Sequence, residues 1–386
     1  MPRATVSRRG EDRVRGGHPW IYRSDVEQVE AAPGDLVQVI GARGRVLGHA
    51  LFSDRSEITL RLVEPGPAAP SATFIKDRLA AAIAFRESLA LDATAYRLVH
   101  GEADRLPSLI VDRYGDYLVV QALSQGIDRR LPEIVSALVE LIPPAGILAR
   151  NDPRVRLLEG LEQKVEPLHG TVPERIDVRE GAVQYQVDPW RGQKTGLFLD
   201  QRENREAARR YARGRLLDAF SYNGGFALAL APGCASVLAV DISEDAVARI
   251  RENAARNGLT NIEARAMNVF DELRELERTG ARFETIVLDP PAFAKNKAAI
   301  RKALTGYKEI NLRALKLLTP GGFLVTCSCS YNVSEEMFVD IVSAAAADAG
   351  VTVSLVEKRA QGRDHPVLIN APETYYLKCL ILRRLA

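Results

Sequence analysis

The sequence predicts an α/β protein with three parts: a small β domain, a middle α/β module and a large doubly wound domain. The large domain is indicated by apolar strand-like runs that alternate with helical patterns from about Tyr185 onward. A second indication is the late run TYYLKCLILRRL, which is rich in β-forming residues and has no helix after it. Such a strand is expected to insert antiparallel beside its neighbours. Short strand patterns with turn residues indicate the β domain at the start.

Residues 1–70 form the predicted β domain. Its strand patterns are GDLVQVI, RVLGHALF and EITLRLV, which GARG and SDRS separate and the breaker EPGPAAP closes. This spacing predicts a small barrel or a curved sheet. Several arginines crowd the start of the chain: Arg3, Arg8, Arg9, Arg13, Arg15 and Arg23. They indicate either a phosphate-contacting surface or a solvated terminus, and the sequence leaves both interpretations open.

Residues 71–184 form the predicted middle module. The run FIKDRLAAAIAFRESL predicts a helix, and SLIVDRY and YLVVQAL predict two strands joined at Gly115-Asp116. A second helix, RRLPEIVSALVELI, and a strand, GILARN, complete the module. Residues 171–190 predict a further strand pair that leads into the third domain, residues 185–386.

The third domain contains a loop that is typical of nucleotide cofactor sites. In RLLDAFSYNGGFAL an apolar strand breaks at Asp218, passes through a turn with Gly224 and Gly225, and continues as an apolar helix. The dinucleotide spacing G-x-G-x-x-G is absent. The next segment, SVLAVDISEDAVARIRENAARNG, predicts a strand that ends at Asp241 and a helix that is capped near Ser243 and stops at Asn257-Gly258.

Asp241 suggests which ligand this loop binds. An acidic side chain at the end of the second strand can accept hydrogen bonds from both hydroxyls of a ribose. We therefore expect adenosine without a diphosphate, and S-adenosylmethionine is the common ligand of that description. The alternative is that Asp218 and Asp241 are only strand-end and helix-capping carboxylates.

Two further strand ends carry reactive groups. Asp289 ends the strand in TIVLDPPAF, and Cys329 ends the strand in FLVTCSCSY. If both strands belong to one parallel sheet, the two side chains face the same cleft, which suggests covalent chemistry on a nucleobase. Cys327 lies two residues earlier on the same face and stays an alternative nucleophile. We expect Cys234 and Cys379 to be structural.

The composition excludes several classes of protein. A net charge of +2 does not by itself indicate a nucleic-acid partner, and no stretch is apolar for the length of a membrane span. The four cysteines lack metal-ligand spacing and a secreted framework. The amino terminus is charged, unlike a signal peptide. We therefore expect a cytoplasmic enzyme without a metal site or a membrane partner.

Several motifs together resemble one family. GQKTGLFLDQRENR, DAFSYNGGFAL, DPPAFAKNK with GYKEINLRALKLLTPGG, and TCSCS are similar to segments of the bacterial 23S ribosomal RNA cytosine methyltransferases that carry an amino-terminal PUA domain. The resemblance covers nearly the whole chain. It implies a Rossmann-like class I methyltransferase domain with a mostly parallel seven-stranded sheet and an antiparallel terminal strand. It also implies an RNA-binding PUA-type domain at the start and a middle module that helps to form an RNA cleft.

The resemblance implies roles for the residues already singled out. S-adenosylmethionine would be the cofactor and 23S ribosomal RNA the substrate. Cys329 would attack carbon 6 of a cytosine, so that carbon 5 can take the methyl group, and Asp289 would bind the exocyclic amine and nitrogen 3. The cofactor would contact Asp218, Phe220, Tyr222, Asn223, Gly224, Gly225, Asp241, Asn268 and Asp289. The substrate would contact Pro290, Pro291, Phe293, Lys295 and Tyr331. Phe293 and Tyr331 flank the two catalytic segments and could stack on the base, or they could equally be packing aromatics.

Two aspects of this mechanism stay open in the sequence. A thiol needs help from a cation, a helix dipole or the substrate to ionise near neutral pH. Lys295 and Lys297 are candidates, although we favour phosphate contact or a solvated loop for both. The base that removes the carbon 5 proton, the cytosine that is modified and the oligomeric state, a homodimer included, are not visible.

Two other classes of function stay open. One is an RNA methyltransferase that modifies an exocyclic amine through the DPPAF loop and needs no cysteine. The other is a non-catalytic RNA-binding factor in ribosome assembly that keeps the cofactor fold.

Overall fold

The computed structural model describes residues 2–293 and 300–385, and the chain divides into two compact units. Unit 1 comprises Met1–Val178, Val187–Leu197 and Asp364–Thr374. Unit 2 comprises Arg179–Gln186, Phe198–Arg363 and Tyr375–Ala386. The chain thus passes repeatedly from one unit to the other. Among the described residues, no helix combines the length and the apolar character needed to cross a bilayer.

Unit 1 begins with a six-stranded sheet in the order β2-β6-β5-β4-β1-β3. Its strands are β1 (Arg3–Val6), β2 (Trp20–Tyr22), β3 (Val26–Glu30), β4 (Leu36–Ile40), β5 (Val46–Phe52) and β6 (Ile58–Pro65). The last three confirm the strands predicted from GDLVQVI, RVLGHALF and EITLRLV. The strands β1 to β3 and the helix α1 (Arg8–Arg15) were not predicted, because they are short and Gly10 interrupts the helical pattern.

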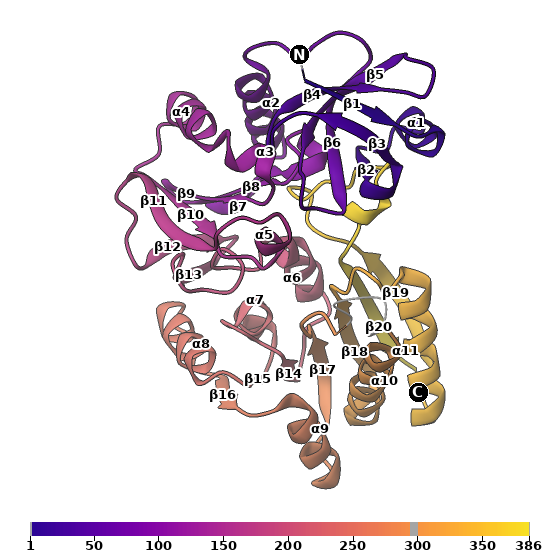
Figure 1. The fold of residues 1–386 in the computed structure, drawn as a ribbon. Coiled ribbons are helices and arrows are strands. Elements are labelled where there is room, and N and C mark those ends of the chain that lie inside the picture. Colours follow the sequence, from indigo (N-terminus) through magenta and orange to yellow (C-terminus); the bar gives the residue numbers. More distant parts are fainter. Residues whose placement is uncertain (1, 294–299, 386) are drawn as a thin grey trace. The chain divides into compact units, whose positions relative to one another are not determined.

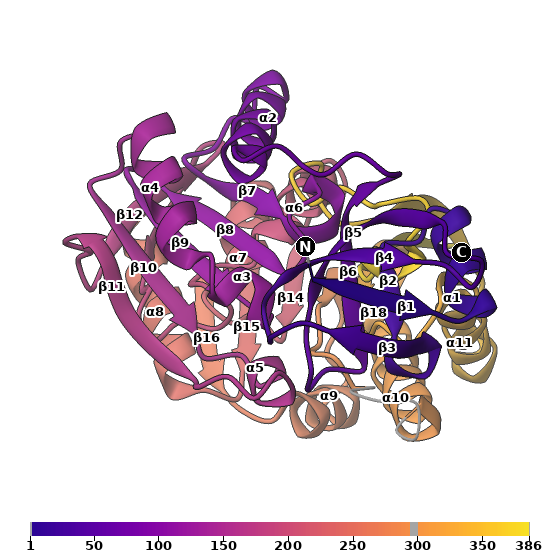
Figure 2. The same ribbon diagram turned by 45° about the horizontal axis from the view of Figure 1, so that its top comes forward.

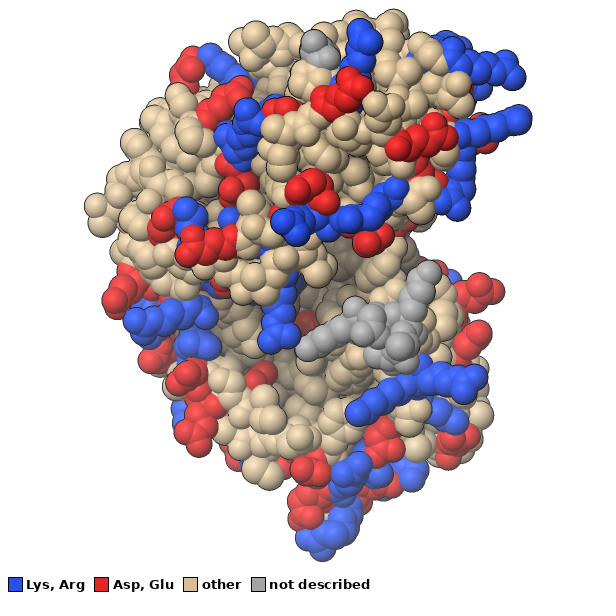
Figure 3. Space-filling view, in the orientation of Figure 1, with Lys and Arg blue, Asp and Glu red and all other residues tan. Residues whose placement is uncertain are grey.

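The arginines near the start of the chain are partly neutralised within unit 1. Arg9 and Arg13 both form ion pairs with the buried Asp25, and Arg15 pairs with Glu11 one turn earlier on α1. On the face drawn in Figure 3, basic and acidic side chains are interspersed rather than gathered into a single basic field. Charge alone therefore does not mark an RNA surface on that face.

The middle part of unit 1 is a five-stranded sheet in the order β11-β10-β9-β8-β7, with its strands side by side in Figure 2. The elements are α2 (Phe74–Ser88), β7 (Ala95–His100), β8 (Leu109–Tyr114), β9 (Tyr117–Ala122), α3 (Gln125–Asp128), α4 (Leu131–Leu141), β10 (Gly146–Asn151), α5 (Val155–Leu158) and β11 (Lys164–Gly170). The predicted hairpin at Gly115-Asp116 is confirmed, since Tyr114 pairs with Tyr117. The hairpin β12 (Ile176–Glu180) and β13 (Val183–Val187) confirms the predicted strand pair.

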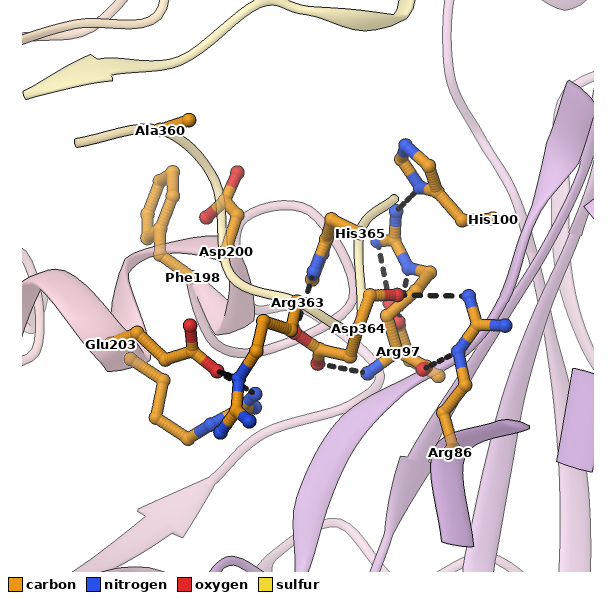
Figure 4. A network of polar contacts seen from close by, with 12 residues as sticks. Arg86, Arg97, His100, Phe198, Asp200, Glu203, Ala360, Arg363, Asp364 and His365 are labelled. Carbon is orange, nitrogen blue, oxygen red and sulfur yellow. Dashed lines mark hydrogen bonds and ion pairs between the residues drawn. The ribbon is translucent and has the colours of Figure 1, made fainter. Parts of the chain in front are cut away.

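A late segment of the chain, Asp364–Thr374, belongs to unit 1 and is tied there by buried polar contacts. Figure 4 shows Asp364 bonded to arginines from α2 and β7. Its backbone oxygen accepts from Arg86 at 2.9 Å, and its carboxylate accepts from the backbone N–H of Arg97 at 2.9 Å. The ring of the buried His365 lies 5.2 Å from that of His100. Burial, the neighbouring His365 ring and nearby arginines hold the pKa of His100 well below its usual value, so this ring is neutral near pH 7.

Unit 2 is built on a seven-stranded sheet in the order β16-β15-β14-β17-β18-β20-β19 (Figure 1). Its strands are β14 (Arg215–Ala219), β15 (Ser236–Asp241), β16 (Ile262–Ala266), β17 (Phe283–Leu288), β18 (Leu318–Ser328), β19 (Val353–Arg359) and β20 (Lys378–Arg384). The strands β14 to β18 pair in parallel, whereas β20 lies antiparallel between β18 and β19. The predicted fold class is confirmed, including the antiparallel insertion of the late apolar run.

Helices cover both faces of this sheet, because its central strands are nearly continuously apolar and successive side chains point to opposite faces. The helices of unit 2 are α6 (Arg202–Arg209), α7 (Gly225–Leu230), α8 (Glu244–Arg256), α9 (Val269–Arg278), α10 (Ile300–Leu317) and α11 (Glu335–Ala349). Leu216 of β14 packs in the cluster with α6, α7 and α8, and its neighbour Leu217 packs in the cluster with α9, α10 and α11. The parallel strands therefore end at one common edge, where the loops of the site begin.

Candidate active site

The carboxyl edge of the seven-stranded sheet gathers the acidic and thiol side chains singled out in the sequence. Asp218 lies near the end of β14 and Asp241 ends β15. Asp289 and Cys329 are the first residues after β17 and β18. Since these strands are parallel, the four side chains lie along one edge of unit 2.

The loop from β14 to α7 is held in a strained conformation. Phe220 and Tyr222 adopt left-handed φ angles of 66° and 51°, and Gly224 follows at 87°. A residue with a side chain pays about 1–2 kcal/mol for this conformation. The loop is stabilised by the bonds of the Ser221 N–H to the Val240 carbonyl at 3.0 Å and of the Tyr222 N–H to Asp241 Oδ2 at 2.8 Å. Strain that neighbouring contacts hold in place is typical of binding loops.

Asp218 is buried below this loop. Its Oδ2 accepts from Ser221 Oγ at 2.5 Å and from the Ala227 N–H at 2.9 Å. Burial raises the pKa of Asp218 to about 7, and the two hydrogen bonds oppose that rise. Among the described residues, Oδ1 has no hydrogen-bond partner. A buried carboxylate oxygen without a partner fits a cofactor that brings a cationic or hydrogen-bonding group, as the ammonium of S-adenosylmethionine would.

Asp241 uses each carboxylate oxygen once within the protein. Oδ2 accepts from the Tyr222 N–H, and Oδ1 accepts from the Ser243 N–H at 3.0 Å. Each oxygen can accept a further hydrogen bond, and the side chain is only partly buried. The position therefore suits the predicted role of accepting from two ribose hydroxyls. The predicted cap of α8 is also present, since Ser243 Oγ accepts from the Ala246 N–H.

Asn268 is exposed and caps α9. Its side-chain oxygen accepts from the Phe270 N–H at 2.9 Å, which leaves the amide NH₂ as the group that can reach a ligand. The rings of Phe220, Phe270 and Phe293 form a cluster beside it, with centroids 6.0–6.4 Å apart. These apolar edges suit an adenine ring.

A buried ion pair that the sequence analysis did not single out supports the cofactor loop. Arg205 of α6 donates to Glu180 of β12 from Nη2, at 2.6 and 2.8 Å, and from Nε, at 3.1 Å. A Cβ at Gly225 would lie 3.2 Å from the guanidinium of Arg205, so glycine allows this close approach. The only signal was the position of Arg205 in GQKTGLFLDQRENR, to which no role was assigned.

Asp289 is oriented by a buried amide relay that was also missed. Gln201 Nε2 donates to Asp289 Oδ1 at 2.8 Å, and Gln201 Oε1 accepts from Asn204 at 2.7 Å. Asn204 in turn accepts from Arg359 of β19 at 3.1 Å. A network of this kind fixes the direction of the carboxylate while leaving its charge in place.

Cys329 is partly buried next to the aspartate motif. Its Sγ lies 3.7 Å from the carbonyl oxygen of Pro290, the residue after Asp289. Cys327, in contrast, is fully buried and lies opposite Cys379 in the ladder of β18 and β20, where both are free thiols. Burial raises the pKa of Cys327 well above its usual value, so this thiol stays protonated. The geometry therefore favours Cys329 over Cys327 as a nucleophile.

The turn that carries Cys329 is fixed from two sides. Tyr307 of α10 forms a hydrogen bond with Ser330 Oγ at 2.8 Å. Lys378, the first residue of β20, donates from Nζ to the Ser330 carbonyl at 2.8 Å and to the Tyr376 carbonyl at 2.9 Å. The two cations considered in the sequence, Lys295 and Lys297, lie outside the described residues.

The other predicted substrate contacts are placed differently from one another. Pro290 is buried and Pro291 is exposed. Phe293 packs against Tyr307 with ring centroids 4.7 Å apart, whereas Tyr331 keeps 51% of its surface exposed.

Within residues 2–293 and 300–385, no group of three or more His, Cys, Asp or Glu side chains could hold a metal ion.

Comparisons with known proteins indicate the family to which the chain is similar. A family model described as an S-adenosylmethionine-dependent methyltransferase matches residues 160–383, and a PUA-like domain model matches residues 4–65. The ribosomal RNA large subunit methyltransferase I of Tolumonas auensis is 42% identical over 95% of both chains. The protein of that name from Klebsiella pneumoniae (strain 342) is 40% identical over 98% of this chain and 97% of its own.

Solved structures share the fold. A putative S-adenosylmethionine-dependent methyltransferase from Streptococcus mutans matches 99% of this chain and 100% of its own, with a TM-score of 0.86 and 22% identity. A putative methyltransferase solved in complex with SAH has the same coverage and identity, with a TM-score of 0.87. At this identity the similarity concerns the fold alone.

Proposed function

The chain belongs to the S-adenosylmethionine-dependent methyltransferase family, and we propose that it methylates carbon 5 of a cytosine in 23S ribosomal RNA. S-adenosylmethionine is its cofactor. Relatives about 40% identical over nearly the whole chain, named ribosomal RNA large subunit methyltransferases, support the RNA substrate. The PUA-like domain at residues 4–65 supports it as well. Such an enzyme would act in the cytoplasm.

The contact between Cys329 and the aspartate motif is the observation that carries this proposal. A thiol 3.7 Å from the Pro290 carbonyl lies beside Asp289, at neighbouring ends of two parallel strands. On the other side of β17, β14 begins the loop that holds Asp218. One edge of the sheet thus carries a nucleophile, an acidic group that could bind the cytosine, and the candidate cofactor residues.

The chemistry requires a nucleophile because carbon 5 of cytosine is weakly reactive in the aromatic ring. The Cys329 thiolate would add to carbon 6 and form a carbon–sulfur bond, and the displaced electron pair would make carbon 5 an enamine carbon. The bound cofactor supplies an electrophilic methyl group to that carbon. Removal of the carbon 5 proton and cleavage of the bond between carbon 6 and Sγ would then restore the aromatic ring and the thiolate.

Asp289 would stabilise the base during this addition. Electron density moves toward nitrogen 3 when sulfur attacks carbon 6, so nitrogen 3 becomes more basic. A carboxylate at the exocyclic amine and nitrogen 3 favours the form that is protonated there. The bond from Gln201 directs Oδ1, and the backbone N–H of Asp289 lies 3.3 Å from the Ala219 carbonyl. Preorganisation of this kind lowers the cost of aligning the base.

A fluorinated RNA tests the covalent step directly. A base cannot remove fluorine from carbon 5 as it removes a proton. An enzyme that attacks carbon 6 therefore accumulates as a covalent adduct. We expect the wild-type protein, with S-adenosylmethionine and large-subunit RNA transcribed with 5-fluorocytidine, to form an adduct that survives a denaturing gel. The Cys329→Ala variant should form none, and Cys327→Ala should form it normally.

The same proteins should be assayed on unmodified RNA with labelled S-adenosylmethionine, and the labelled nucleoside identified by mass spectrometry. Label in 5-methylcytosine that depends on Cys329 supports the proposal. Label in a methylated amino group, or 5-methylcytosine made by Cys329→Ala, contradicts it. A protein that binds the cofactor but transfers no methyl group to any large-subunit RNA or precursor also contradicts it.

A further inference from the structure

We propose that Lys378 is a positioning residue for Cys329, whose ammonium group favours the thiolate form of that side chain. The inference rests on the proposed function, since it matters for catalysis only if Cys329 is the nucleophile. The effect of Lys378 on the ionisation of the Cys329 thiol can be measured without RNA.

Lys378 is a buried cation without an acidic partner in direct contact. Only 2% of its surface is exposed, and Nζ donates to two backbone carbonyls, those of Ser330 and Tyr376. Within the described part of the chain, it forms no ion pair with a carboxylate. Buried lysines are rarely kept without such a partner, because the protein does not recover the lost hydration of the charge. A role for the charge at this place is therefore expected.

The register of the sheet brings Lys378 against the two residues that flank Cys329. In the antiparallel ladder of β18 and β20, Lys378 lies directly opposite Ser328. Opposed residues of such a ladder have Cα atoms about 4.5–5.5 Å apart. On the other side of Cys329, the Ser330 carbonyl accepts from Nζ at 2.8 Å. The lysine thus anchors the turn that carries the thiol, and its charge lies at that turn.

The charges of the two groups act on each other. Burial lowers the pKa of Lys378 to about 8, and negative charge at Cys329, and then at Glu335, raises it. Because this interaction is reciprocal, the protonated lysine lowers the pKa of the Cys329 thiol. The lysine remains mostly protonated near neutral pH, where the thiolate is needed.

Other ionisable groups around the turn do not replace this cation. Burial raises the pKa of Tyr307, so the phenol on α10 is neutral at working pH. Glu335 of α11 is bound by Lys358 at 2.9 Å and by Tyr375 at 2.7 Å. The carboxylate of Asp289, beside the Pro290 carbonyl, opposes a thiolate at Cys329. A cation on the β20 side offsets that opposition.

The test measures how fast Cys329 is alkylated by iodoacetamide between pH 6 and 10. The alkylated cysteine is identified by peptide mass spectrometry, because Cys234, Cys327 and Cys379 are also free thiols. Lys378→Gln removes the charge and keeps an N–H donor for a carbonyl. We expect the midpoint of the rate profile to rise by about one pH unit, and the rate at pH 7 to fall about tenfold. An unchanged midpoint in the folded variant would overturn the inference.

Two further variants separate charge from general effects. Lys378→Arg keeps the charge and should stay close to the parent midpoint. Lys358→Gln removes an exposed lysine on the adjacent β19 and should not move the midpoint. A shift in Lys358→Gln as large as that in Lys378→Gln would overturn the inference. If Lys378→Gln does not fold, Lys378→Met carries the same test, because it removes the charge and fills the site.

The inference and the proposed function fail in different ways. If Cys329→Ala still makes 5-methylcytosine, the proposed function is wrong, whatever the alkylation profile shows. If Cys329 proves essential but the alkylation midpoint is the same in Lys378→Gln as in the parent, only the inference about the lysine is wrong.

Discussion

In unit 2, functional side chains are held in place both at the loops after β14 and β15 and at the ends of β17 and β18. The contacts that hold them differ between these two regions. After β14 and β15, the groups that fix the functional side chains come from these two neighbouring loops and their helices: Ser221 and Ala227 bind Asp218, and Tyr222 and Ser243 bind Asp241. At the ends of β17 and β18, the partners are remote. Asp289 is bound by Gln201, and the turn of Cys329 is bound by Lys378.

This difference separates two kinds of constraint. The two cofactor loops can form their binding geometry as soon as β14 and β15 pair and their helices are in place. The nucleophile end needs Gln201, just before α6, and also α10 and β20 to be packed before its side chains point correctly. We therefore expect cofactor binding and methyl transfer to respond separately to mutation.

The largest expected separation comes from Cys329→Ala. The variant should lose about 10⁴-fold or more in kcat, as enzymes do when a nucleophile is removed. Its affinity for S-adenosylmethionine should stay within about twofold of wild type, since β17 lies between its strand and β14 in the sheet. Methyl transfer rates and calorimetric titration of the cofactor test both halves. A matching loss of cofactor affinity would show that the two ends are not independent.

Asp241→Ala should give the opposite pattern. It removes two predicted bonds to ribose hydroxyls and also frees the N–H groups of Tyr222 and Ser243, which hold the strained loop. Hydrogen bonds to charged groups contribute about 1.5–3 kcal/mol, so the Kd for the cofactor should rise roughly 10- to 100-fold. Alkylation of Cys329 should not change. A Kd equal to that of wild type would contradict the role of Asp241.

Gln201→Met should weaken only the β17 end. The substitution keeps the volume of the side chain and removes the donor that directs Asp289. We expect kcat to fall about tenfold, which corresponds to about 1.4 kcal/mol, with little change in cofactor affinity. Single-turnover rates at saturating cofactor measure this effect. Asn204→Ala, which removes the donor to Gln201, should give a smaller loss in the same direction.

The smallest effect concerns the pH dependence of stability in the cofactor-free protein. The pKa of Asp218 is raised to about 7 in the folded protein, so folding favours its protonated form. The stability gained in this way is complete below about pH 4, the unfolded value, and is lost as the pH rises toward 7. Urea unfolding between pH 4 and 8 should show this slope in the wild type and a flatter profile in Asp218→Asn. Equal slopes would mean that Asp218 does not titrate in this range.

The sequence predicted the parts of the molecule that depend on local signals. The strand that ends at Asp241, the cap at Ser243 and the stop at Asn257-Gly258 were all correct, because each depends on residues a few positions apart. The antiparallel insertion of the late strand was also correct. The fold class follows from such patterns.

The supporting residues could not be predicted in this way. In the sequence, Lys378 is a polar residue at the start of an apolar strand, and Gln201 is one of many polar residues before a helix. Their importance comes from burial and from partners 48 and 88 positions away. Neither periodicity nor spacing carries that information, because tertiary packing alone creates it.

The position of β20 has a consequence for synthesis of the protein. This strand is made after every other strand of its sheet, yet it lies between β18 and β19, which therefore cannot join the sheet side by side without it. The emerging chain can form the β14 and β15 loops early, but it gains the surroundings of Cys329 only when residues 378–384 have left the ribosome tunnel. A nascent chain would thus be able to bind the cofactor while it is still unable to transfer the methyl group. The thiol would be positioned for reaction last.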